Sequence, residues 1–143
     1  MSKPRVLFLC TSNSARSQMA EAFLRHDAGD RFEAHSAGLE PRSIHPYTLR
    51  VMEEIGFDLA GHRSKNLDEY LGKVHFGYLI TVCSNAEKNC PLFPGVSVRE
   101  YWPFDDPAAY EGMEEEKLAK FREVRDQIRS RVQAWIAQRD AEP

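Results

Sequence analysis

A cysteine and an arginine near the start of the chain have the C-x5-R spacing of an oxyanion-binding loop. The apolar run 6–9 leads into Cys10, and Arg16 follows after five intervening residues. If the run is a strand and a helix starts after the loop, the loop's N–H groups converge on one point and the helix dipole adds positive charge there. The residues that we expect to bind the anion together with Arg16 are Thr11, Ser12, Asn13, Ser14 and Ala15.

Cys10 is the candidate nucleophile of this loop. Arg16 can donate to two oxygens of a tetrahedral anion, and the donors that hold a phosphate-like anion also favour a thiolate. We therefore expect the Cys10 thiol to ionise readily. Most free cysteines are instead small buried hydrophobes. The context favours chemistry here, because small polar residues fill the loop and a helical pattern covers 17–24.

Two further cysteines follow a second apolar run, 78–82. Cys83 directly follows this run, and six residues separate Cys83 from Cys90. At the end of a parallel strand, Cys83 would share the rim of the sheet with Cys10 and could attack an adduct formed there. The polar segment between the two cysteines predicts a short helix that separates the thiols when reduced and unwinds when they join, since a disulfide needs Cα atoms within roughly 7 Å. Three such thiols can act as a relay.

Two other interpretations of Cys83 and Cys90 stay open. They can be inert core thiols, or they can bind a metal together with a histidine such as His75. The spacing is wider than that of the usual zinc knuckle and there is no second close pair. We therefore predict no metal site.

A proline-punctuated loop contains the candidate general acid. Asp105 and Asp106 precede Pro107, after a weak strand pattern that should return to the same rim. An oxygen that leaves as an anion needs a proton, which an aspartic acid beside the loop can donate. We choose Asp106 for this role and keep Asp105 as the second choice. Simple turn formation is the alternative for both.

Alternating strand and helix patterns predict the fold. Strands are predicted at 6–9, 78–82, 32–35 and 96–101, and an amphipathic helix at 113–139. A helix carrying Met52 and Ile55 is expected to begin at Pro46 and end at Gly56, and Asn66 to cap a further turn. Such alternation implies right-handed crossovers. We predict an α/β fold: a single three-layer domain over 1–143, with a central four-stranded parallel sheet and helices on both faces.

The length, charge and apolar stretches of the chain limit the functions that it can have. The chain has 143 residues, a formal net charge of −3 and an isoelectric point near 6.0, so nothing indicates a basic surface for nucleic acid. The first predicted strand leaves no room before it for a signal peptide, and no apolar stretch approaches membrane-spanning length. We expect a cytoplasmic protein without membrane contact, and its three cysteines then suggest transient redox chemistry.

Together these segments resemble the thioredoxin-coupled arsenate reductases, which share the fold of the low-molecular-weight tyrosine phosphatases. The resemblance runs from about Arg5 to Trp135 and includes Ser36-Ala37-Gly38 and the segment 61–64. All three cysteines, Arg16 and the Asp106-Pro107 pair are in the family's order and spacing. The resemblance implies an enzyme with no tightly bound cofactor, whose substrate is arsenate, with phosphate or sulfate as analogues, and whose external reductant is thioredoxin. We also expect a monomer.

The resemblance also implies a role for each cysteine. Cys10 attacks arsenate, Cys83 attacks Cys10 and releases arsenite, and Cys90 then moves the disulfide to Cys83–Cys90, where thioredoxin reduces it. Ser17 donates to the Cys10 thiolate and Asp106 is the general acid. Asn13 braces the loop.

The chain departs from the family at a potassium site that some members have near Asn13, Glu21 and Ser36. An acidic residue of those members is replaced by Lys65 here, whose ammonium can take the ion's place beside Glu21.

Two other functions compete with the reductase. A true low-molecular-weight phosphatase would use Cys10, Arg16 and Asp106 and then let water hydrolyse the adduct. Such phosphatases usually have a second cysteine where this chain has Ala15, and aromatic residues where it has Ala108 and Ala109. They have no use for Cys83 and Cys90. Weak phosphatase activity is expected as a side reaction. A non-catalytic anion or metal sensor is the other alternative, but it would have no use for a general acid, a nucleophile and an arginine together.

Overall fold

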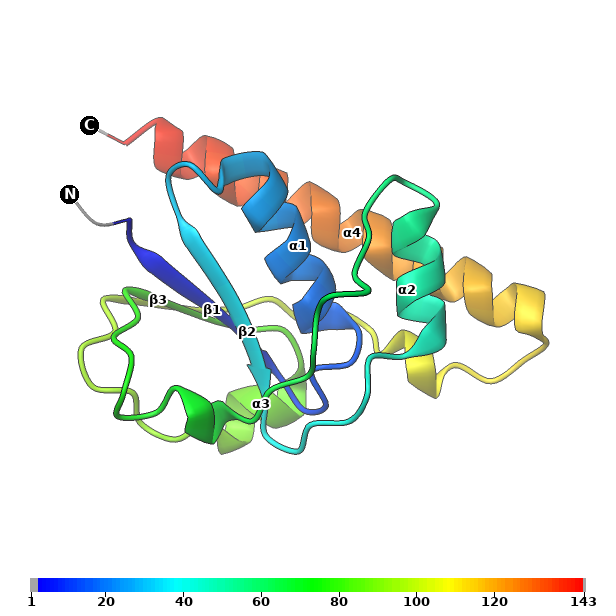
Figure 1. The fold of residues 1–143 in the computed structure, drawn as a ribbon, viewed down its shortest axis with the longest axis horizontal. Coiled ribbons are helices and arrows are strands. Elements are labelled where there is room, and N and C mark those ends of the chain that lie inside the picture. Colours follow the sequence, from blue (N-terminus) through cyan, green and yellow to red (C-terminus); the bar gives the residue numbers. More distant parts are fainter. Residues whose placement is uncertain (1–2, 143) are drawn as a thin grey trace.

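A four-stranded parallel sheet forms the centre of the computed structural model, which describes residues 3–142 (Figure 1). The strand order is β2-β1-β3-β4, and every neighbouring pair is parallel. The inner strand β1 is wholly buried from Val6 to Leu9 because both of its faces are covered, which explains its continuous apolar run. The strands are β1 (Arg5–Cys10), β2 (Glu33–Gly38), β3 (Tyr78–Thr81) and β4 (Val98–Tyr101).

The predicted fold class is confirmed, with helical segments on both faces of the sheet. In Figure 1, α1 and α4 lie together on one side of the strands with α2 beside them, and α3 lies on the other side with the short 3-10 helix η1 (Leu67–Glu69). The ends of the predicted domain, at 1 and 143, lie outside the described residues. The helices are α1 (Arg16–Ala28), α2 (Pro46–Glu53), α3 (Ser84–Asn89) and α4 (Glu114–Asp140), and a second 3-10 helix is η2 (Pro107–Ala109).

The long helix α4 buries one stripe of side chains against the rest of the protein. Most of its polar residues face solvent, although Arg125 is buried, and its first turn holds three glutamates, which suits the helix dipole. The stripe predicted from the sequence is buried as expected, and it consists of Leu118, Phe121, Val124, Ile128, Val132 and Trp135.

Some predicted boundaries need correction. Helix α2 begins at Pro46, but it ends at Glu53, so Ile55 lies beyond it in the turn that Gly56 closes with a φ of +87°. Strand β2 extends to Gly38, past the predicted end at His35, because Ser36-Ala37-Gly38 pairs with the last three residues of β1. Asn66 caps a turn as predicted, but this turn is the 3-10 helix η1.

The register brings the carboxyl ends of all four strands to one edge. Cys10 pairs with Gly38, and Thr81 pairs with both Leu9 and Tyr101. The loops that follow the strands therefore meet at this edge, where ligands bind in open parallel sheets. No helix within residues 3–142 has the length and apolar character to cross a membrane.

Candidate active site

The loop between β1 and α1 is held in shape by Asn13. This residue is fully buried and has a φ of +53°, a left-handed conformation that asparagine tolerates better than most residues. Its Nδ2 donates to Ser17 Oγ at 2.7 Å and to Ser36 Oγ at 2.9 Å, and its Oδ1 accepts from the backbone N–H of Lys65 at 2.9 Å. These bonds tie the loop to α1, β2 and the segment before η1, so Asn13 braces the loop as the family resemblance implies.

The Cys10 sulfur makes two hydrogen bonds inside this loop. Cys10 is 3 % exposed, Ser17 Oγ lies 2.8 Å from Sγ, and the backbone N–H of Asn13 donates to Sγ over 3.2 Å. Burial raises the pKa of the Cys10 thiol, while the Ser17 hydroxyl, the charge of Arg16 and the Asn13 N–H lower it. Burial therefore opposes the ready ionisation that the loop sequence predicts, and the three donors favour the thiolate, so this ionisation stays a prediction.

Arg16 stands at the first turn of α1 and faces the loop that carries the two aspartates. Its Nη1 donates to the carbonyl oxygen of Phe104 at 3.0 Å, and its Nη2 lies 3.7 Å from Asp106 Oδ2. The guanidinium side chain is 12 % exposed, so its charge is little screened by solvent. Arg16 thus links the oxyanion loop to the loop of the candidate acid.

Asp106 and Asp105 point to different neighbours. Asp106 lies beside Arg16 and caps η2 by accepting from the backbone N–H of Ala108 at 3.0 Å. Asp105 Oδ2 instead pairs with Lys120 Nζ at 2.9 Å, on the exposed side of α4. The structure therefore favours Asp106 over Asp105 as the candidate acid, although Asp106 also forms the turn that was the alternative.

One cavity of about 310 Å³ joins these groups. Cys10 lies in its wall together with Arg16 and Asp106, so the three groups that the chemistry needs face the same space. The volume is ample for a tetrahedral oxyanion. The other lining residues are Ser12, Ser14, Ala15, Arg42, Ser43, His45, Ala108 and Ala109.

Cys83 and Cys90 flank the short helix α3, as the sequence predicted. Cys83 is buried at the N-cap, where its sulfur accepts from the backbone N–H of Ala86 at 3.4 Å and lies 3.4 Å from Thr11 Oγ1 of the oxyanion loop. Cys90 is half-buried at the other end, and its Sγ donates to the carbonyl oxygen of Pro91. All three cysteines are free thiols. Cys83 thus borders the loop of the candidate nucleophile, and α3 separates it from Cys90.

Within residues 3–142, no group of three histidine, cysteine or acidic side chains is arranged to hold a metal ion. The alternative in which His75 joins Cys83 and Cys90 as a ligand finds no support in this arrangement. Inert core thiols remain the competing interpretation for the two cysteines.

The surroundings of Glu21 do not fit the potassium ion that the family resemblance suggests. Glu21 is 3 % exposed, and its Oε1 accepts from Ser36 Oγ at 2.6 Å. Lys65 Nζ lies 3.7 Å from the same oxygen, and Arg25 Nη1 lies 2.8 Å from the other one. Two cationic side chains already compensate this carboxylate, so a third positive charge would be repelled.

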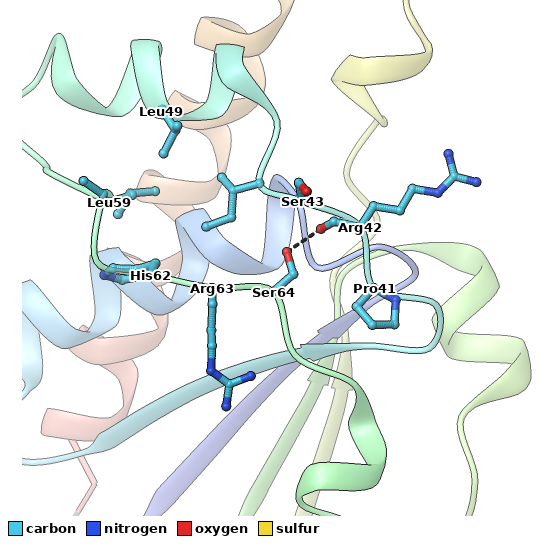
Figure 2. A pocket seen from close by; sticks show the side chains of 10 residues that line it. Pro41, Arg42, Ser43, Leu49, Leu59, His62, Arg63 and Ser64 are labelled. Atoms are coloured by element: carbon cyan, nitrogen blue, oxygen red, sulfur yellow. Dashed lines mark hydrogen bonds between the residues drawn. The ribbon is translucent and has the colours of Figure 1, made fainter.

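Sequence reasoning missed one wall of the cavity, which comes from the β2–α2 connection. Arg42, Ser43 and His45 line the cavity there, and the first two also line a neighbouring cavity of about 500 Å³ (Figure 2). The Arg42 side chain extends away from the other residues of that second cavity in Figure 2. Only His45 had a sequence signal, since it stands directly before Pro46 at the predicted start of α2.

The chain belongs to the low molecular weight phosphotyrosine protein phosphatase family, whose model matches residues 5–142. Within this family, it is 43 % identical over 136 residues to an arsenate reductase of Bacillus licheniformis, covering 94 % of this chain and 96 % of the relative. A solved arsenate reductase in its phosphate-binding state is 31 % identical with a TM-score of 0.78, covering 94 % and 98 % of the two chains. A thioredoxin-dependent arsenate reductase of Corynebacterium glutamicum is 29 % identical with a TM-score of 0.60, covering 92 % and 63 %.

Proposed function

We propose that this protein reduces arsenate to arsenite through an adduct on Cys10 and a relay of its three thiols. The observation that carries the proposal is the position of Cys83. Its sulfur lies 3.4 Å from a hydroxyl of the oxyanion loop, and α3 connects it to Cys90. A hydrolase has no use for this pair of thiols, and relatives at about 40 % identity over most of the chain are named arsenate reductases.

The first step forms the adduct. The Cys10 thiolate attacks arsenic, Arg16 and the loop N–H groups hold the other oxygens, and one oxygen leaves as water after Asp106 supplies a proton. In the second step the Cys83 thiolate attacks the Cys10 sulfur. The sulfur–arsenic bond breaks and its electron pair stays on arsenic, so arsenate becomes arsenite while Cys10 and Cys83 are oxidised to a disulfide.

The third step regenerates the nucleophile. The Cys90 thiolate attacks the Cys83 sulfur, which frees Cys10 and leaves a Cys83–Cys90 disulfide. We assign thioredoxin as the dithiol that reduces this bond, and one solved relative is named thioredoxin-dependent. Burial raises the pKa of Cys90, so unwinding of α3 would expose this thiol and favour its attack.

Phosphate ester hydrolysis is the second candidate, since it needs only Cys10, Arg16 and an acid. The walls of the cavity argue against it as the main activity. Ala108 and Ala109 line the cavity directly after the Asp106-Pro107 pair. They offer no aromatic surface on which an aryl substrate could stack.

Arsenite production by the purified protein tests the proposal. We expect multiple turnovers with thioredoxin, thioredoxin reductase and NADPH, and none from the Cys10→Ser variant. Glutathione with glutaredoxin serves as the alternative electron source. Turnover with this source and none with thioredoxin would leave the reductase assignment intact and overturn the assignment of the reductant.

A further inference from the structure

His45 is fixed to the oxyanion loop by its backbone. Its N–H donates to the carbonyl oxygen of Ser14 at 3.0 Å, and the Thr48 hydroxyl donates to the same oxygen at 3.0 Å. The start of α2 is therefore fastened to the loop that follows β1. The backbone at position 45 is thus held beside the loop that contains Ser14.

The hydrogen bonding of His45 fixes which of its two ring nitrogens carries the proton. Nδ1 accepts a hydrogen bond from the backbone N–H of Tyr47 at 3.0 Å, and because a backbone N–H can only donate, the neutral ring carries its proton on Nε2. The ring packs against Phe121 with 4.8 Å between centroids. Within residues 3–142, Nε2 makes no hydrogen bond to a protein atom, and the ring borders the cavity that contains Cys10 and Arg16.

The surroundings favour the neutral form of this ring. Burial lowers the pKa of His45, and the nearby charge of Asp106 only partly opposes this effect. A neutral imidazole that uses Nδ1 as an acceptor is a hydrogen-bond donor at Nε2.

We propose that His45 is an additional oxyanion-binding residue, whose Nε2–H donates to an oxygen of the anion held by Arg16. The inference rests on the proposed role of the loop in binding arsenate. It adds a donor from the N-cap of α2 to the donors of the loop and of α1, so the anion is held from two sides. A cap of α2 alone would require Nδ1 and would leave Nε2 without a role.

Two substitutions separate these roles. In His45→Asn, the side-chain oxygen can replace Nδ1 as the acceptor for the Tyr47 N–H, but no donor reaches the cavity. In His45→Gln, the longer amide can replace the Nε2 donor, but the cap is lost. Isothermal titration with inorganic phosphate then measures anion binding without turnover, and arsenate kinetics supply KM and kcat.

We expect His45→Asn to bind phosphate about tenfold more weakly than the unmodified protein, as for a lost hydrogen bond to a charged group, with KM raised and kcat little changed. His45→Gln should stay close to the unmodified protein in affinity. Normal binding by His45→Asn, or equal weakening of both variants, would overturn the inference in favour of capping or ring packing. If the unmodified protein bound no phosphate, both this inference and the proposed oxyanion loop would fail. Normal phosphate binding without arsenite production would contradict only the proposed function.

Discussion

The hydroxyl of Ser17 is directed at the sulfur of Cys10. Ser17 Oγ accepts a hydrogen bond from Asn13 Nδ2 at 2.7 Å and lies 2.8 Å from Cys10 Sγ. Because an amide N–H already occupies the oxygen as a donor, the hydroxyl proton is free to point at the sulfur. This contact stabilises the thiolate against the burial that raises its pKa.

Replacing this hydroxyl should make Cys10 harder to ionise. In Ser17→Ala we expect the pH profile of Cys10 alkylation to shift to higher pH by about one unit, because a hydrogen bond to the charged form has been lost. Ser43→Ala is the matched control, since Ser43 lines the same cavity and makes no hydrogen bond to the sulfur. An unchanged profile in Ser17→Ala would show that the contact does not stabilise the thiolate.

The acid step should depend on Asp106 and not on its neighbour. We expect Asp106→Asn to lower kcat for an aryl phosphate by about 100-fold, a typical contribution of general acid catalysis. Asp105→Asn should retain most of the rate, because Asp105 pairs with Lys120 and not with Arg16. Steady-state hydrolysis by the two variants checks this, and equal losses would refute the assignment of Asp106.

Gly38 is required because β2 passes close to the oxyanion loop. A Cβ atom at this position would lie 2.7 Å from the carbonyl oxygen of Thr11 and 2.9 Å from the backbone nitrogen of Asn13. Backbone atoms cannot rotate away, so Gly38→Ala should lower the free energy of unfolding by about 1–3 kcal/mol and weaken phosphate binding. Gly61→Ala is the control, since no atom lies within 4 Å of its added Cβ. Urea unfolding of both variants measures the difference, and equal stability would contradict this account.

The ammonium of Lys65 should replace a bound potassium ion beside Glu21. Exchange of potassium for sodium at constant ionic strength should leave activity and melting temperature nearly unchanged in the unmodified protein. In Lys65→Asp we expect potassium to become stabilising, because one of the two cationic side chains that compensate Glu21 is replaced by a carboxylate. The exposed Lys73 provides a control substitution, Lys73→Asp. A potassium-specific stabilisation of the unmodified protein would count against the replacement.

Local patterns predicted the fold class, which the structure confirms, and they placed Cys10 and Arg16 on one loop between a strand and a helix. Val6 to Leu9 is apolar because β1 is buried on both faces, and the C-x5-R spacing needs only one loop between a strand and a helix. The carboxyl end of β2 was harder to predict. Ser36-Ala37-Gly38 pairs with β1 there, but these three residues form no apolar pattern of their own.

Contacts distant in sequence could not be predicted. His45 enters the cavity because its backbone N–H binds Ser14, 31 positions earlier in the chain, and its ring packs on Phe121 of α4. The pKa of Cys10 depends on how completely the folded protein covers the sulfur, which the loop sequence does not specify.

The relay is the central claim, and the two thiols beyond Cys10 test it. Cys90→Ser should permit at most one turnover and accumulate a Cys10–Cys83 disulfide that peptide mass mapping can detect. Hydrolysis of an aryl phosphate is the internal control, because it needs neither Cys83 nor Cys90. It should survive both Cys83→Ser and Cys90→Ser. Survival of hydrolysis would show that the oxyanion loop is intact in each variant.

The most direct measurement is arsenate reduction by Cys83→Ser with thioredoxin, thioredoxin reductase and NADPH. The account predicts no catalytic arsenite formation, because no thiol then stands beside Thr11 to attack the Cys10 sulfur. Multiple-turnover reduction by this variant would contradict the relay.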